Sequence, residues 1–181
     1  HTHAYKRPWP GLNGKPVFST PEQVITRFDE LGIEKGCILP IVNSEVYLPQ
    51  SNEEVLEMCD KYPDRFIPFC NIDPRAITNS CDAPLDYILQ YYKDLGCRGI
   101  GEVMPNLPFL HPKSLNLFKH CQTVGLPLTF DISDRLDGDY GFQDDPGLPQ
   151  LESVLKSFQK LTIVCHGPAF WAEIGKLETP G

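Results

Sequence analysis

Apolar residues recur at helical spacing in some segments of the chain and form short continuous runs in others. In the first such segment Val24, Phe28 and Leu31 share one helical face. Thr20 before Pro21 supplies the capping side chain and the first-turn proline that favour the start of a helix. The same signals predict helices over residues 20–31, 51–62, 84–95, 112–124 and 148–158.

The continuous apolar runs fall between these helical segments. They predict strands over residues 36–42, 66–70, 97–103, 127–132 and 161–165. Buried strands that alternate with amphipathic helices are typical of a parallel sheet covered by helices. We therefore expect an α/β fold without a linker or a second domain.

Composition limits the partners of this fold. The chain has 181 residues, 41% hydrophobic and 22% charged, with a net charge of −8. Nucleic-acid and anionic-membrane surfaces need clustered Lys and Arg, so we expect neither partner. The seven cysteines are odd in number and form no Cys-x-x-Cys pair, which favours reduced core thiols and a cytoplasmic protein.

Polar side chains that bind metals or transfer protons follow nearly every predicted strand. In parallel α/β folds these positions meet at one rim, where the chemistry is located. In chain order they are His1 and His3; Asn43, Ser44 and Glu45; Asn71 and Asp73; Glu102; Asp131; and His166.

The first pair, His1 and His3, has the spacing of two ligands of one metal ion. Side chains on a strand alternate, so these imidazoles would point the same way. The pair by itself fits a solvated chain end equally well. Together with Glu102, Asp131 and His166 it indicates a divalent metal site. The two other histidines, His111 and His120, lie beside a predicted helix; we expect His120 to be solvated and His111 to be at most a substrate contact.

The pattern resembles the amidohydrolase superfamily, in particular the metal-dependent hydrolases and decarboxylases of its amidohydrolase-2 group. The resemblance rests on the His-x-His start and on residues 125–130 (GLPLTF), 139–152 (DYGFQDDPGLPQLE) and 165–171 (CHGPAFW). It implies a TIM-type (β/α)8 barrel, of which residues 1–181 form a single domain with about the first six strand–helix units, incomplete at both ends. It also implies that His1 and His3 hold zinc or manganese with ligands from later strands, and that identical chains associate into oligomers.

Roles for the later residues stay open. Glu102 is a ligand, a carboxylate that orients a neighbouring histidine, or a structural residue. His166 binds metal in binuclear members of the group and faces the substrate in mononuclear ones. Asp131 stands where the group usually has a histidine, and it is either a ligand and proton acceptor or a polar rim residue. The aspartate that ends the group's eighth strand has no match.

The leading hypothesis is a metal-dependent hydrolase acting on a small carboxylate, amide or lactone, with His166 and Asp131 as catalytic residues. Non-oxidative decarboxylation or hydration on the same scaffold is an alternative. A non-catalytic barrel relative that serves as a binding subunit is another, motivated by Asp131 and by the unmatched aspartate. A phosphate-binding barrel is disfavoured, because no glycine-rich loop follows a late strand.

Overall fold

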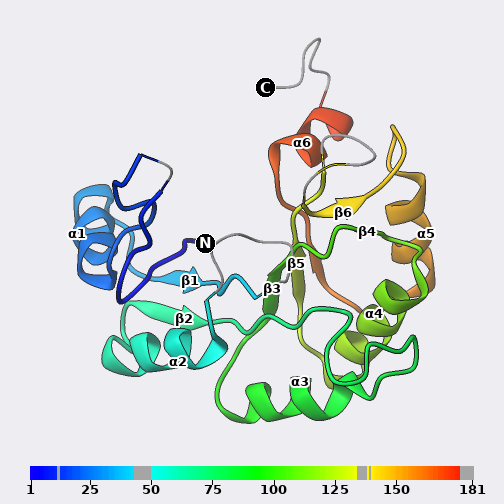
Figure 1. The fold of residues 1–181 in the computed structure, drawn as a ribbon, viewed down its shortest axis with the longest axis horizontal. Helices are drawn as coiled ribbons and strands as arrows, with labels where there is room; N and C mark the ends of the chain where they lie inside the picture. The colour runs from blue at the N-terminus through cyan, green and yellow to red at the C-terminus, as the bar shows by residue number, and fades with distance from the viewer. Residues whose placement is uncertain (12, 43–49, 134–137, 139, 176–181) are drawn as a thin grey trace.

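Each helix that the hydrophobic spacing predicts is present. The computed structural model describes residues 1–11, 13–42, 50–133, 138 and 140–175 (Figure 1). The expected helices are α1 (Pro21–Leu31), α2 (Asn52–Lys61), α3 (Leu85–Asp94), α4 (Pro112–Val124) and α5 (Pro149–Ser157). A further helix, α6 (Pro168–Ile174), was not expected. In the described part of the chain, no helix has the length and apolar character needed to cross a membrane.

The start of α1 shows why its boundary was predictable. The Thr20 hydroxyl accepts a hydrogen bond from the Gln23 backbone N–H, and the Gln23 side chain accepts one from the Thr20 N–H. This reciprocal pair satisfies two backbone donors that an isolated helix end leaves free. Gly32 then ends the helix in the left-handed conformation.

The predicted strands are present but shorter than their apolar runs. They are β1 (Gly36–Ile38), β2 (Phe66–Pro68), β3 (Ile100–Val103), β5 (Leu128–Phe130) and β7 (Ile163–Val164). Two short strands, β4 (Leu107–Pro108) and β6 (Phe142–Gln143), were not expected, and they pair with each other. Among the described residues these named strands pair only in parallel, which confirms the parallel α/β class.

The five expected strands follow one another in space in the order of the sequence. β1 pairs with β2, and β3, β5 and β7 form a three-stranded sheet in that order. A bridge from Cys70 to Ile100 links the chain after β2 to β3, and a bridge from Thr2 to Ile38 places the first residues beside β1. Within the described residues these strands form an open succession of sheets and do not close into a barrel.

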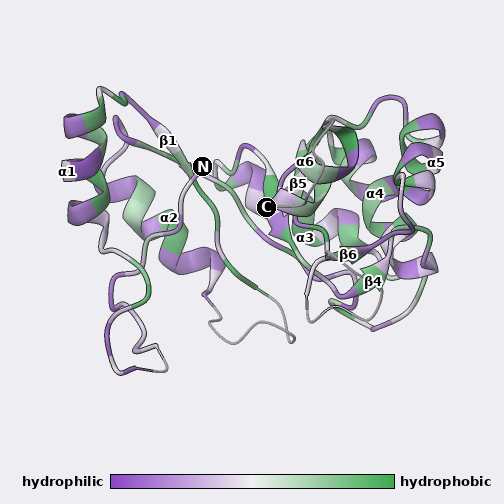
Figure 2. Cartoon of the chain, turned by 90° about the horizontal axis from the view of Figure 1, so that it is seen from above, coloured by the Kyte–Doolittle hydropathy of each residue, from purple (hydrophilic) through white to green (hydrophobic). Residues whose placement is uncertain are grey.

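Two hydrophobic clusters support this succession. The larger one lies between β3, β5 and β7 and helices α3, α4 and α5, and the smaller one joins α1 and α2 to β1 and β2. Figure 2 shows the two groups of helices on opposite sides of the molecule, with the chain start between them. All seven cysteines are unpaired, and Cys59, Cys70, Cys97 and Cys121 are buried core residues as expected.

Asp144 stabilises the start of α5 from outside the helix. Leu148 is the N-cap of α5 and provides no capping side chain. Instead, the Asp144 carboxylate accepts hydrogen bonds from the backbone N–H groups of Gln150 and Leu151 at 3.0 and 2.8 Å. These are the donors that an N-cap side chain would otherwise satisfy.

We expect Asp144→Ala to lower the free energy of unfolding by about 2 kcal/mol, because buried helix donors lose a charged acceptor. Urea unfolding followed by circular dichroism measures this loss. Asp145→Ala is the matched control, since the neighbouring side chain is exposed; it should change the value by less than ~0.5 kcal/mol. Equal shifts for the two variants would contradict the assignment.

Candidate metal centre

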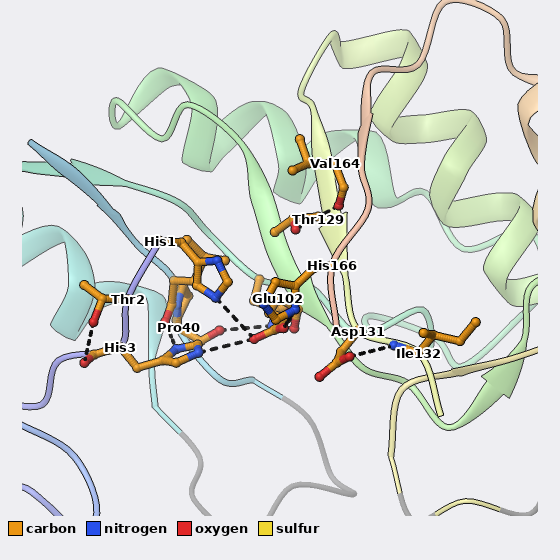
Figure 3. Close-up of polar contacts among 12 residues, drawn as sticks. His1, Thr2, His3, Pro40, Glu102, Thr129, Asp131, Ile132, Val164 and His166 are labelled. Carbon is orange, nitrogen blue, oxygen red and sulfur yellow. Dashed lines mark hydrogen bonds and ion pairs between the residues drawn. The ribbon is translucent and has the colours of Figure 1, made fainter. Parts of the chain in front are cut away.

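His1 and His3 are held on one side of an extended segment, as their spacing predicts. The Thr2 backbone N–H donates to the Cys37 carbonyl oxygen at 2.9 Å, and the Leu39 N–H donates to the Thr2 carbonyl oxygen at 3.2 Å. The Thr2 main chain therefore pairs with β1. Because side chains alternate along an extended segment, those of His1 and His3 point to the same side, opposite to that of Thr2. Figure 3 shows both imidazoles directed toward Glu102.

Glu102 is the carboxylate on which the histidines converge. It lies in β3, and its side chain is only 5% exposed. Its Oε2 atom lies 3.2 Å from His3 Nε2 and 3.8 Å from His1 Nε2, and its Oε1 atom lies 2.5 Å from His166 Nδ1. His166 comes from the chain just after β7, so three segments far apart in the sequence contribute to the cluster.

The cluster has the dimensions of a metal site. One ligand atom each from His1, Glu102 and His166 lies within 4.8 Å of the other two. The ring centroids of His1 and His166 are 4.5 Å apart, and those of His1 and His3 are 5.5 Å apart. His3 also faces this carboxylate but lies outside that closest group (Figure 3).

The orientation of His3 is fixed by a backbone carbonyl. His3 Nδ1 lies 2.8 Å from the Leu39 carbonyl oxygen. A carbonyl only accepts, so Nδ1 donates its proton to Leu39, and this contact directs Nε2 toward Glu102. A metal-binding histidine commonly donates its other ring N–H in this way. The Leu39 contact was not anticipated, because a main-chain oxygen carries no side-chain signal.

Two atoms of the cluster lack a hydrogen-bond partner among the described residues. Glu102 Oε1 and His166 Nδ1 are both buried, and their close approach does not have hydrogen-bond geometry. Burying a polar atom without a hydrogen-bond partner costs free energy. A divalent cation shared by these atoms would satisfy both, and nitrogen and carboxylate oxygen are ligands of zinc and manganese. The residues present therefore fit a metal.

Asp131 lies beside this cluster but is not part of the closest group. It follows β5, and its Oδ1 atom accepts a hydrogen bond from the Ile132 backbone N–H at 2.9 Å. Gly167, which follows His166, packs so closely against Oδ1 that a side chain there would collide with it. Burial raises the pKa of the Asp131 carboxyl, and the Glu102 carboxylate raises it further. A ligand role for Asp131 stays a prediction.

The other expected rim residues have different environments. Asn43, Ser44 and Glu45 lie outside the described residues. Asp73 binds the Arg75 guanidinium through both carboxylate oxygens at 2.7 and 2.8 Å.

The two remaining histidines belong to α4, one as its N-cap and one within it, and lie outside the cluster. His111 caps α4, where its Nδ1 accepts from the Lys113 N–H at 3.1 Å. His120 was expected to be solvated, but its side chain is only 13% exposed and lies 3.4 Å from an Asp86 oxygen, because α3 packs against α4.

Neither a protein-family model nor a curated protein sequence matches this chain. Solved structures do match. A probable 2-pyrone-4,6-dicarboxylic acid hydrolase from Acinetobacter baumannii is 16% identical, with a TM-score of 0.60, over 91% of this chain and 55% of its own. An uncharacterised TIM-barrel protein from Bordetella bronchiseptica is 19% identical, with a TM-score of 0.62, over 82% and 51%.

A third match is 2,6-dihydroxybenzoate decarboxylase from Rhizobium, 14% identical with a TM-score of 0.55, over 91% of this chain and 65% of its own. The chain thus spans between about half and two thirds of the length of these three proteins. At this level of identity the matches establish the fold. The strand succession of this chain corresponds to part of a TIM barrel.

Proposed function

We propose that this chain carries the metal centre of a metal-dependent hydrolase of the amidohydrolase-2 group. The observation that supports this most strongly is the convergence of His1, His3 and His166 on the buried Glu102 carboxylate. The open strand succession supports it too, because it matches part of TIM-barrel proteins that include a hydrolase and a decarboxylase. We propose one barrel domain to which residues 1–181 contribute.

In this proposal His1, His3 and Glu102 hold the cation, with His166 as a further ligand or as a substrate contact. A bound zinc or manganese ion supplies Lewis acidity and lowers the pKa of water toward ~7. Asp131 accepts the proton of the attacking water; burial raises the pKa of its carboxyl, which makes it a stronger base than an exposed aspartate. His166, whose side chain is 36% exposed, donates to the substrate carbonyl or carboxylate oxygen.

The substrate in this proposal is a small carboxylate, amide or lactone. Non-oxidative decarboxylation is the second candidate, favoured by the likeness to 2,6-dihydroxybenzoate decarboxylase. The two reactions differ in their products, so one substrate panel separates them. The panel contains 2-pyrone-4,6-dicarboxylate and 2,6-dihydroxybenzoate, with ring opening followed by absorbance and carbon dioxide release followed by a coupled assay.

The first test is elemental analysis of the full chain, purified without a histidine tag and after incubation with Zn²⁺ or Mn²⁺. We expect about one equivalent of metal or more per chain, held by paired imidazole and carboxylate ligands. The double variant His1→Ala, His3→Ala should lose it, since both imidazole ligands from the first residues of the chain are gone. His120→Ala is the control, because this histidine pairs with Asp86 on α3.

Absence of metal from the wild-type chain, or unchanged metal content in the double variant, would contradict the proposed centre. The chain would then be better explained as a non-catalytic barrel relative, and the search would turn to binding partners.

A further inference from the structure

The buried side chain of Asn71 links the two strands on either side of its own. Asn71 is 2% exposed and follows β2. Its Nδ2 group donates one hydrogen bond to the Glu102 carbonyl oxygen at 2.7 Å and one to the Pro40 carbonyl oxygen at 3.1 Å. The two amide hydrogens therefore connect the end of β3 to the chain after β1.

Asn52 in turn holds the main chain of Asn71. Its Oδ1 accepts from the Asn71 backbone N–H at 2.7 Å, and its Nδ2 donates to the Asn71 carbonyl oxygen at 3.1 Å. Asn52 is the first residue of α2 and is 5% exposed. Asn71 lies beyond the paired part of β2, so this side-chain amide replaces the partner strand that its main chain lacks.

Both ends of the Asn71 link lead to a proposed metal ligand. Glu102 supplies the carboxylate. Pro40 directly follows Leu39, whose carbonyl oxygen lies 2.8 Å from His3 Nδ1 and fixes that ring. A single amide thus connects the main chain that carries Glu102 to the main chain that orients His3. The 3.2 Å separation of His3 Nε2 from Glu102 Oε2 depends on both.

We propose that Asn71, held by Asn52, is a positioning residue that sets the separation and orientation of His3 and Glu102 for cation binding. This rests on the proposed metal centre. Ligands that are held rigidly lose less conformational freedom when a cation binds. Removing a residue that hydrogen-bonds to a metal ligand commonly weakens metal affinity by about 10–100-fold.

A purely structural role for Asn71 gives a different expectation. A buried amide that satisfies two carbonyl groups stabilises any fold, wherever it lies. Asn116 offers the matched control: it is 7% exposed and donates through Nδ2 to the Ala83 carbonyl oxygen at 2.9 Å. It lies on α4, which contributes no residue to the cluster.

The test compares Asn71→Ala with Asn116→Ala in the full chain by competition of Zn²⁺ against a chelator and by the absorption spectrum of bound Co²⁺. We expect Asn71→Ala to weaken Zn²⁺ binding by ~10–100-fold and to change the Co²⁺ spectrum. Asn116→Ala should keep the wild-type Zn²⁺ affinity and Co²⁺ spectrum, even if its thermal unfolding midpoint falls as far as that of Asn71→Ala. Wild-type affinity in Asn71→Ala, or an equal loss in Asn116→Ala, would overturn the proposal.

A second measurement needs no metal and separates this proposal from the proposed function. In metal-free protein, ¹⁵N resonances of His3, assigned by their loss in His3→Ala, should report a proton on Nδ1. We expect Asn71→Ala to shift them toward a tautomer mixture and Asn116→Ala to leave them unchanged. If the wild-type chain binds no cation, the proposed function fails and this comparison decides the positioning role. Unchanged His3 resonances in Asn71→Ala would then reject it.

Discussion

Replacing Glu102 with alanine is expected to weaken cation binding strongly and, with it, the proposed metal-dependent activity. Glu102 contributes the carboxylate of the closest group of ligand atoms, and three imidazoles face it. Without it, nothing in this group offsets the charge of a cation, and the imidazoles lose their common partner. We expect at least ~100-fold weaker Zn²⁺ binding.

The loss of turnover follows from the loss of the cation. A bound metal contributes several kcal/mol to transition-state stabilisation, which corresponds to a decrease of ~10²–10⁴-fold. Calorimetric titration with Zn²⁺ and turnover of the active substrate from the panel measure the two effects. Glu102→Gln keeps the shape of the side chain and one neutral oxygen. Its Zn²⁺ affinity and turnover should therefore lie between those of Glu102→Ala and the wild type.

Glu53→Gln is the control for Glu102. Glu53 lies in the first turn of α2 and accepts a hydrogen bond from the Tyr92 hydroxyl at 2.7 Å, away from the cluster. It should bind Zn²⁺ as the wild type does. A Glu102→Ala protein that retains its metal at wild-type affinity would show that the cation is held elsewhere.

The second large effect is on stability. We expect Phe142→Ala to lower the free energy of unfolding by ~3–5 kcal/mol, because a fully buried ring leaves a cavity. The Phe142 ring is 0% exposed and stacks on Phe109 with centroids 4.5 Å apart. It also lies against the rings of Phe118 and Phe130, with centroids 5.5 and 6.1 Å from its own. A loss of this size is a large part of the ~5–15 kcal/mol that holds a typical domain.

Urea unfolding monitored by circular dichroism measures this loss. Tyr87→Ala is the control, since Tyr87 on α3 is 75% exposed; it should change the free energy of unfolding by less than ~0.5 kcal/mol. Phe142→Leu keeps most of the volume and should lose less than alanine. If Phe142→Ala unfolds at the wild-type urea concentration, the aromatic cluster does not carry the stability assigned to it.

The sequence determined helices α1 to α5 because their signals are local. Thr20, Gln23 and Gly32 lie within or beside α1, and they fix its ends without help from distant residues. The apolar runs located β1, β2, β3, β5 and β7, but their lengths depend on where a partner strand begins and ends. The pairing of β4 with β6 had no signal at all, because two-residue strands carry no periodicity.

Part of the site was also present in the sequence. Alternation along an extended segment places His1 and His3 on one side, and the parallel arrangement brings Glu102 and His166 to the same rim. Both inferences need only the period of a strand and the direction of the sheet. They hold whatever the distant packing is.

Tertiary structure alone decided how these residues are held. The Leu39 carbonyl that orients His3 is a main-chain atom, identical in every residue type, so no sequence pattern reveals it. The exchange of hydrogen bonds between Asn52 and Asn71 depends on α2 lying across the end of β2. Gly167, from the chain after β7, packs closely against Asp131 Oδ1. Side-chain direction at a strand end follows from the donors and acceptors that folding brings near, and these come from segments far apart in the chain.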